Sequence, residues 1–243
     1  MMRTIVFGSL LLGWGTLLAT FQASGGQETP EQMVEKIHWL GQATVKIQIG
    51  EKVIYVDPYQ IKKDDQADIV LITHSHQDHF SPDDLARVVT DNTVFIAPLD
   101  CAQKLKGKFA NQIIVSSPGM KTNVGGIDVE AVPAYNVIKT KFHPKEKAWV
   151  GYVLTIEGVR IYHAGDTERI PEMKNIDCHI ALLPLGQTYT MNSVEEAAEV
   201  ALDVHARIAI PIHYGLYEGK TSDAEEFKKL LEGKVVVVIK PKE

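Results

Sequence analysis

Cysteine and positive charge are both scarce in this chain of 243 residues. Cys101 and Cys178 are its only cysteines, which excludes a disulfide framework as the basis of the fold. Its 25 Lys and Arg against 31 Asp and Glu give a net charge of −6, without a basic block. We therefore expect no nucleic-acid partner. Hydrophobic residues make up 45% of the chain and charged residues 23%, which excludes a wholly disordered protein.

The motifs of covalent hydrolases are also missing. The chain contains no G-x-S-x-G, the signature of a serine nucleophile on a strand-to-helix turn. Cys178 has no neighbours that indicate a reactive thiol. The sequence therefore gives no support to catalysis through a covalent serine or cysteine intermediate.

Long apolar runs are confined to the amino terminus. Residues 5–21 form an uncharged, mostly apolar stretch after Arg3, and small residues follow at 23–26. This pattern is typical of a secretory signal peptide over residues 1–25. An uncleaved membrane anchor is the alternative, although the run is short for a span. In either case we expect residues 26–243 to form one exported domain, periplasmic or extracellular, that contacts a membrane only through the amino-terminal segment. The sequence does not indicate an oligomeric state.

After this segment, short β-branched runs alternate with capped helices. Helices are predicted to begin near Ser81 and Ser193, because each residue can cap the apolar stripe that follows it. A further helix is predicted over 222–231 and another between the strands at 94–97 and 113–115. Strands are predicted at residues 37–40, 44–49, 53–56, 69–73, 94–97, 113–115, 127–132, 150–156, 159–162, 180–185, 208–212 and 235–239. Strand pairs followed by strand–helix alternation occur twice, which predicts an α/β sandwich of two similar halves with helices outside.

The strongest functional signal is His74-Ser-His-Gln-Asp-His79, which follows the buried strand predicted at 69–73. His74 and His76 point to the same side while the chain is extended, and Asp78 and His79 fall in the turn that follows. Imidazole and carboxylate together suit Zn²⁺, and also Mn²⁺ or Fe²⁺. Two pairs of ligands at adjacent points are compatible with two metal ions.

Further metal-capable residues stand at the ends of later predicted strands. They lie in the segments 133–136, 162–167 and 211–215, and His143 follows the first of these. Because α/β folds place their sites at strand ends, we expect these segments to converge on residues 74–79.

Three of these motifs, HSHQDH, HAGDT and PIHYG in this order, resemble the metallo-β-lactamase fold superfamily of metal-dependent hydrolases. The likeness covers nearly all of the chain after the leader. Within this superfamily, the chain resembles a branch of largely uncharacterised hydrolases in four segments, VDPY, HAGDT, LLPLGQTYTM and PIHYG. Its better-known relatives are ascorbate-6-phosphate lactonases and phospholipase-D-type enzymes that cleave N-acylphosphatidylethanolamine. The resemblance implies a four-layer αββα sandwich and a hydrolase, but not β-lactamase activity.

Position by position, the resemblance implies two divalent metal ions, most readily Zn²⁺. The first two histidines of HSHQDH would bind one ion. The last two residues of that motif and a later histidine would bind the second, and an aspartate would bridge both. These ligands are His74 and His76 for the first ion, Asp78, His79 and His213 for the second, and Asp166 as the bridge. Asp78 and Asp166 are also the catalytic residues that the resemblance implies.

The middle motif departs from the pattern of the family. Where relatives carry a further histidine for the first ion, this chain has Asn136, whose amide oxygen is a weaker ligand for Zn²⁺. Either His143 reaches back to substitute for it, or the first site is more open. Lys139, Lys141 and Lys145 surround His143 and could face an anionic substrate, or form a solvated basic loop.

Other polar residues near the motifs have two interpretations each. His163 could line the cavity as a metal or substrate residue, or make hydrogen bonds behind it. Asp57 could orient a ligand histidine through its second ring nitrogen, although Asp-Pro is also a turn signal. Tyr189, Thr190 and Tyr214 are candidate pocket residues, or simply packing residues.

The expected chemistry follows from the metal pair. Two ions would lower the pKa of a water held between them from ~15.7 toward ~7, and the resulting hydroxide could attack an ester-like bond in a small-molecule or lipid-like substrate. A lactone and a phosphodiester are the two substrates that the resemblance favours. One alternative is a di-iron redox protein on the same fold, but such members usually carry a carboxylate where this chain has His76. The other alternative is a non-catalytic metal-binding module.

Overall fold

The computed structural model of the protein describes residues 28–62 and 65–243. The predicted signal peptide or anchor at 1–25 lies outside these residues. Within them, none of the helices combines the length and the apolar character that crossing a membrane requires.

The amino-terminal half forms a six-stranded sheet whose strands lie in chain order. The strands are β1 (Ile37–Gly41), β2 (Thr44–Ile49), β3 (Lys52–Val56), β4 (Ala67–Leu71), β5 (Val89–Pro98) and β6 (Ile113–Ser116). β1 to β3 pair antiparallel, and β3 to β6 pair parallel. Helix α1 (Pro30–Glu35) precedes the sheet, and α2 (Pro82–Val88) and α3 (Leu99–Lys106) connect its parallel strands.

The carboxyl-terminal half repeats this plan in a seven-stranded sheet of order β13-β12-β11-β10-β9-β8-β7. The strands are β7 (Lys121–Val124), β8 (Ile127–Pro133), β9 (Val150–Ile156), β10 (Val159–His163), β11 (Ile180–Pro184), β12 (Ile208–Ile212) and β13 (Val236–Val237). β7 to β10 pair antiparallel and β10 to β13 pair parallel. The α-helices of this half are α4 (Val194–Asp203) and α5 (Thr221–Leu230), and two short 3-10 helices lie at Lys145–Lys147 and Pro171–Asn175.

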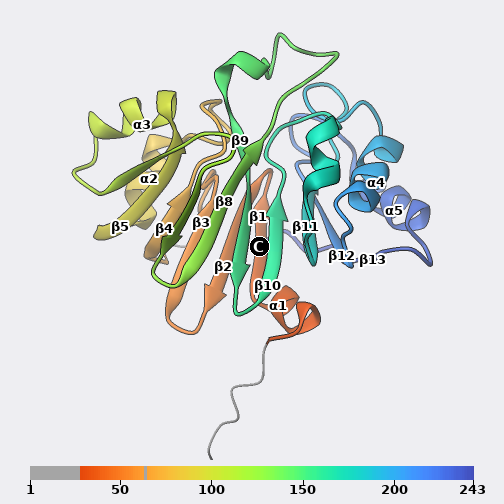
Figure 1. The fold of residues 1–243 in the computed structure, drawn as a ribbon, viewed down its shortest axis with the longest axis horizontal. Helices are drawn as coiled ribbons and strands as arrows, with labels where there is room; N and C mark the ends of the chain where they lie inside the picture. Colours follow the sequence, from red (N-terminus) through yellow and green to blue (C-terminus); the bar gives the residue numbers. More distant parts are fainter. Residues whose placement is uncertain (1–27, 63–64) are drawn as a thin grey trace, which may run out of the picture.

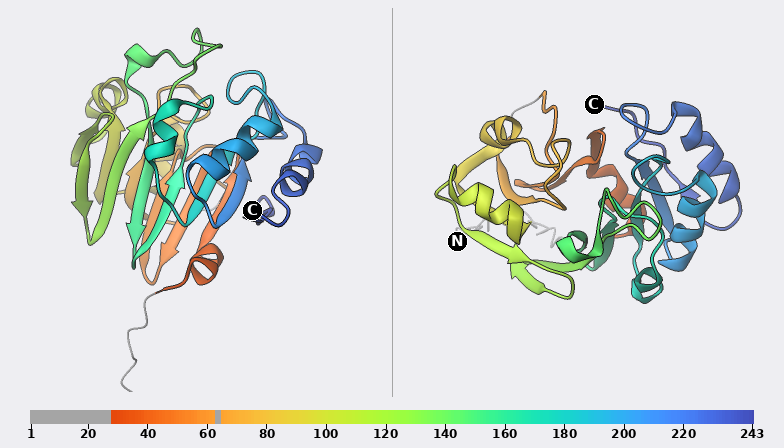
Figure 2. Two further views of the ribbon diagram at one scale, coloured as in Figure 1. Left: turned by 45° about the vertical axis from the view of Figure 1, so that its right-hand side comes forward. Right: turned by 90° about the horizontal axis from the view of Figure 1, so that it is seen from above.

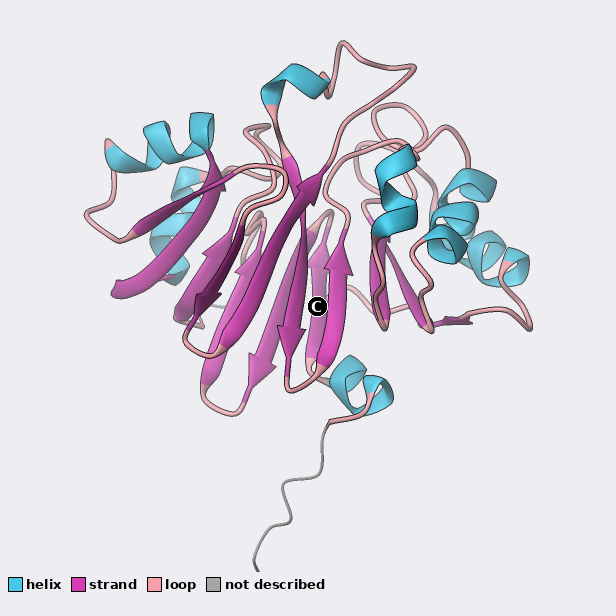
Figure 3. Cartoon of the chain, viewed as in Figure 1, coloured by secondary structure: helices cyan, strands magenta, loops and turns pink. Residues whose placement is uncertain are grey.

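The two sheets pack face to face, and helices α2 to α5 cover their outer sides (Figure 1). α2 and α3 lie on one flank and α4 and α5 on the other, which is clearest from above (Figure 2) and in the colouring by secondary structure (Figure 3). One apolar cluster joins the sheets, with Ile47 and Ile54 from the first and Leu154 and Ile161 from the second. The predicted four-layer α/β sandwich is confirmed.

The elements that were not predicted, or were predicted with wrong bounds, are either polar or very short. β7 reads Lys-Thr-Asn-Val and forms the edge of its sheet, where polar side chains are normal. The last strand was expected over 235–239, but β13 contains only Val236–Val237. α1 has six residues, too few to show an apolar stripe.

Gly165 closes the turn that follows β10. Its φ is +64°, and a Cβ built there would lie 3.1 Å from Thr73 Cβ and 3.0 Å from the carbonyl oxygen of Val150. Gly50 has a similar φ of +58°, but a Cβ there would meet nothing within 4 Å. The two glycines therefore share a backbone conformation and differ in the room around them.

Gly165→Ala should lower the free energy of unfolding by more than Gly50→Ala. Both substitutions place a side chain in the left-handed region, which costs about 1–2 kcal/mol. At Gly165 the crowding beside Thr73 should add about 1–3 kcal/mol. Urea unfolding of the metal-free proteins measures the difference. Equal losses in the two variants would show that the turn has room for a side chain.

Candidate metal centre

The segment 74–79 leaves the first sheet after β4 and closes into a tight turn. The backbone N–H groups of His79 and Phe80 donate to the carbonyl of His76 over 3.1 and 2.8 Å. Helix α2 begins directly afterwards, with the Ser81 hydroxyl accepting from the backbone N–H of Asp84, as predicted. The turn thus directs His74 and His76 toward one group of neighbouring side chains, and Asp78 and His79 toward another, at the end of the first sheet.

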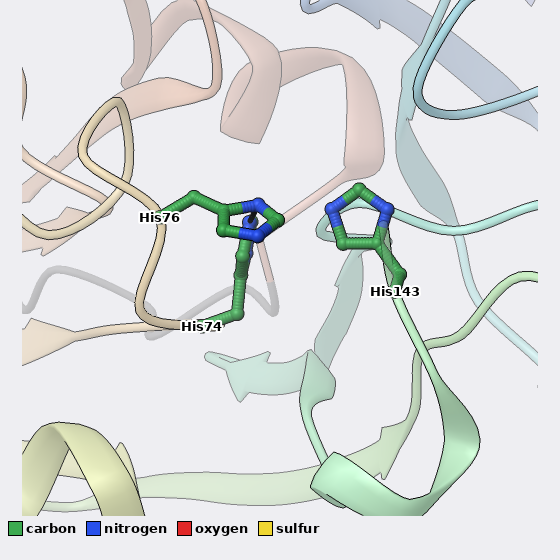
Figure 4. A group of neighbouring side chains, drawn as sticks. All are labelled: His74, His76 and His143. Carbon is green, nitrogen blue, oxygen red and sulfur yellow. Dashed lines mark hydrogen bonds between the residues drawn. The ribbon is translucent and has the colours of Figure 1, made fainter. Parts of the chain in front are cut away.

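The first ligand group joins His74 and His76 to His143, which comes from the loop between β8 and β9. Their ligand atoms lie within 4.8 Å of one another, and the three rings converge (Figure 4). His74 Nε2 and His76 Nδ1 are 3.0 Å apart. His143 Nδ1 donates to the carbonyl of Tyr189 over 3.2 Å, so its Nε2 carries the free lone pair. That nitrogen is buried and has no hydrogen-bond partner among the described residues.

The second ligand group consists of Asp78, His79 and His213. His213 directly follows β12 and has a positive φ of 57°. The Nε2 atoms of His79 and His213 are 3.3 Å apart, and Asp78 Oδ2 lies 3.7 Å from each. Gln42 Nε2 donates to the same Asp78 oxygen over 2.8 Å. The ligands of this group thus come from both halves of the molecule.

Asp166 lies between the two groups. Its Oδ1 is 3.3 Å from His79 Nε2 and 3.2 Å from His213 Nε2. Its Oδ2 is 3.4 Å from His143 Nε2 and 3.9 Å from His74 Nε2. Oδ1 is buried without a hydrogen-bond partner in the part of the chain that the structure describes. One carboxylate oxygen therefore faces each group, and nitrogen and oxygen ligands of this kind fit divalent transition-metal ions.

Asp57 holds the second group in place from behind. Its buried carboxylate accepts from the backbone N–H of Thr73 over 2.7 Å and from the Thr73 hydroxyl over 2.6 Å. Its Oδ2 lies 2.7 Å from His79 Nδ1. This contact puts the proton of His79 on Nδ1 and leaves Nε2 to face the other ligands.

Glu218 has the corresponding position behind His213, and the sequence analysis missed it. Its Oε1 lies 3.0 Å from His213 Nδ1. Its Oε2 accepts from the backbone N–H groups of Thr188 and Tyr189 over 2.8 and 2.6 Å. The sequence carries a weak signal of a turn here, since Gly215 and Gly219 flank Glu218, and in the structure the Gly215 N–H donates to the carbonyl of Glu218. Nothing in the spacing indicates that the turn folds back onto the histidine.

Two expected site residues lie outside both groups. Asn136 Nδ2 donates to the carbonyl of Tyr189 over 2.7 Å and to that of Lys139 over 3.2 Å, so Asn136 fastens the loop while His143 stands beside His74. Of the two interpretations of His163, the role as a metal or substrate residue is wrong, and the hydrogen bonds behind the cavity are what the structure shows. His163 Nε2 donates to the carbonyl of Ala43 over 2.9 Å, and its Nδ1 accepts from the Gly165 N–H over 3.2 Å, so neither nitrogen is free.

A cavity of about 400 Å³ opens over the two groups, a size that suits a small molecule. Of the three further pocket candidates, Tyr189 lines this cavity. Tyr214 instead stacks on Trp39 at 4.9 Å, and buried Thr190 donates to the carbonyl of Gly186. The lining residues are Tyr59, His76, Gln77, Asp78, Phe142, His143, Asp166, Tyr189, His213 and Tyr217.

The two groups differ in their protonation. Burial lowers the pKa of His74 well below its usual range, so this imidazole is neutral. Burial also acts to lower the pKa of His79, but Asp166 and Asp57 outweigh it and raise that pKa to about 10. Burial opposes ionisation of Asp78, yet His213 and His79 hold its pKa at about 2. Asp166 likewise raises the pKa of His213 well above its usual range against the effect of burial. Without metal, the second group and Asp166 therefore form a cluster of carboxylates and protonated imidazoles.

Comparison with known proteins identifies the family. The model of the β-lactamase superfamily domain matches residues 36–213. A UPF0173 metal-dependent hydrolase of Thermococcus onnurineus is 32% identical over 230 residues, covering 86% of this chain and 97% of that protein. The chain belongs to this hydrolase family of the metallo-β-lactamase superfamily. The kinship with ascorbate-6-phosphate lactonases stays a prediction.

Solved structures agree with this family. A Parabacteroides distasonis protein assigned as a metal-dependent hydrolase is 37% identical, with a TM-score of 0.75 over 84% of this chain and 91% of that one. The metallo hydrolase Igni18 of Ignicoccus hospitalis is 24% identical, with a TM-score of 0.72 over 85% and 95% of the two chains. The latter likeness shows the fold alone. The chain is thus a metal-dependent hydrolase whose His and Asp groups are candidates for the metal ligands.

Asp57→Asn should weaken metal binding about 10–100-fold, because an amide cannot accept from both Thr73 and His79 as the carboxylate does. Zinc titration of the purified protein measures the affinity of each site. Asp68→Asn is the matched control, since exposed Asp68 accepts only from the backbone N–H of Val53 among the hydrogen bonds described. Unchanged affinity in Asp57→Asn would show that His79 needs no support.

Metal binding should release protons at neutral pH and should strengthen as the pH rises. The pKa of His79 in the metal-free protein is about 10, so this imidazole is protonated at pH 7 and must lose its proton to bind an ion. Affinity should therefore keep rising until the pH passes that value. Calorimetric titration in two buffers of different ionisation enthalpy counts the protons. No net release at pH 7 would contradict the assignment of His79.

Proposed function

We propose that this hydrolase binds two divalent metal ions, most readily Zn²⁺, and cleaves an ester-like bond such as that of a lactone or phosphodiester. The observation that carries the proposal is the position of Asp166. Each of its carboxylate oxygens lies within 4 Å of the imidazole nitrogens of a different ligand group. A carboxylate between two sets of imidazoles is a suitable bridge for an ion pair.

The residues of the first group would hold one ion and those of the second group the other. When bound, the ions would polarise the scissile group and lower the pKa of a water between them. The side chain of Asp78 is 22% exposed and lines the cavity. Because its pKa is about 2, Asp78 is ionised and can accept a hydrogen bond from the attacking water, which orients that water toward the substrate.

The position of His76 favours hydrolysis over di-iron redox chemistry. An imidazole nitrogen of His76 lies within the first group, where the redox members that the sequence analysis considered carry a carboxylate. The open cavity above the ligands favours an enzyme over a purely metal-holding module. We also propose, from the pattern of residues 1–25, that the protein is exported, and that a small-molecule or lipid-like ester is its substrate.

The zinc-loaded protein should hydrolyse members of a panel of generic lactones and phosphodiesters. Asp78→Asn and His143→Ala should each lower kcat/KM by more than about 100-fold, since loss of a ligand weakens binding more than loss of its supporting residue does. Metal content per chain and a visible spectrum separate zinc from iron. His38→Ala is the control, because His38 lies outside both groups and contacts Glu243. Full turnover with one ion per chain would contradict the two-metal proposal.

A further inference from the structure

Two aromatic pairs form the walls of the cavity above the ligand groups. Phe142 and Tyr189 meet edge to face, with ring centroids 4.8 Å apart, next to His143. Tyr59 and Tyr217 form the other pair, with centroids 6.4 Å apart and their hydroxyl oxygens 2.5 Å apart. All four rings line the cavity.

These rings are accessible to a ligand. Tyr189 is 37% exposed and Tyr217 is 51% exposed, although aromatic side chains gain most when buried. The walls are also held in position from behind. Glu218 binds the backbone of Tyr189, and the carbonyl of the same residue accepts from Asn136 and His143. The Phe142 and Tyr189 wall is therefore fixed to the ligands of the first group.

Lysine and arginine side chains are absent from the lining that the structure describes. Lys139 Nζ donates to the carbonyls of Gln187 and Met191 over 3.3 and 2.9 Å. Lys141 and Lys145 line a second cavity of about 700 Å³, which shares no lining residue with the first. Lys141 Nζ also lies over the Phe142 ring, 4.6 Å from its centroid. Of the two interpretations of these lysines, the one in which they face an anionic substrate is therefore not supported by the lining of the first cavity.

The charge of a substrate would be balanced only where it meets the metal ions. Farther out, a permanent anion would lie against aromatic rings, Gln77 and the carboxylate of Asp78. An anion without a cationic partner is costly to remove from water. A flat, uncharged ring, in contrast, gains from offset or edge-to-face contact with each pair.

We propose that the substrate carries an uncharged planar ring beside its scissile bond, held between the Phe142–Tyr189 and Tyr59–Tyr217 pairs. This inference rests on the proposed hydrolytic function and specifies its substrate class. A substrate with a phosphate or carboxylate beyond the scissile bond is disfavoured, because neither lysine nor arginine lines the described cavity.

Binding of neutral amides tests the inference without requiring turnover. The zinc-loaded full chain is titrated calorimetrically with 3-phenylpropanamide, with 3-cyclohexylpropanamide, and with the 4-carboxy derivative of the phenyl compound. The phenyl amide should bind at least about threefold more tightly than the cyclohexyl amide, because only the flat ring makes favourable aromatic contacts. The carboxylated compound should bind at least about tenfold more weakly than its neutral parent.

Variants locate the preference in the cavity. Phe142→Leu and Tyr189→Leu keep apolar bulk and remove a ring, so each should bring the phenyl-to-cyclohexyl ratio toward one. Phe142→Tyr keeps the ring and should retain the preference, which guards against a misfolded leucine variant. Phe109→Leu is the matched control, since Phe109 packs on Phe95 at 5.4 Å and does not line the cavity.

The outcomes separate this inference from the proposed function. Equal binding of the phenyl and cyclohexyl amides, or tighter binding of the carboxylated compound, would overturn the inference. Methyl 3-phenylpropanoate and methyl 3-cyclohexylpropanoate, added to the lactone and phosphodiester panel, then report turnover. A ring preference in binding without hydrolysis of any compound would overturn only the proposed function. Hydrolysis without any ring preference would overturn only the inference.

Discussion

The burial of Asp166 is the constraint on which the metal centre depends. A carboxylate that is 5% exposed must be paired with positive charge, and imidazoles from both sheets surround it. Burial acts against its ionisation, yet His213 and His79 keep its pKa well below the usual range. The same carboxylate raises the pKa of His213 well above its usual range against the effect of burial. In the metal-free centre, protonated imidazoles therefore balance the charge of Asp166. Divalent ions would take over this role when the histidines lose their protons.

The layers of the fold could be predicted because buried strands and helices leave recurring apolar patterns in the sequence. β11 and β12 are buried along their whole length, and such strands appear as unbroken apolar runs. β7 alternates between exposed and half-buried residues, so it carries no run to detect. The HSHQDH motif was equally visible, since its ligands lie within six residues and one turn brings them together.

The parts of the candidate metal centre that the sequence did not predict depend on contacts between loops that are distant in sequence. Asn136 and His143 were both candidates for one position, and only the fold of their loop shows that the asparagine binds the carbonyl of Tyr189 while the histidine faces Asp166. Glu218 supports His213 through a turn whose path no local pattern predicts. The lysines near His143 suggested an anion site because their sequence neighbourhood is basic. In the structure, however, the ammonium group of Lys139 donates hydrogen bonds to backbone carbonyls.

Because the candidate ligands come from both halves, bound metal ions would crosslink the tertiary structure. His74 belongs to the amino-terminal half and His213 to the carboxyl-terminal half, so ions bridged by Asp166 would close a loop of more than half the chain. Closing long loops restricts the unfolded chain and favours the native state. The two buried cysteines are unpaired and supply no such closure. Bound metal would therefore stabilise the native state of this sandwich as disulfides stabilise small secreted domains. A chelator would destabilise it as a reductant destabilises those domains.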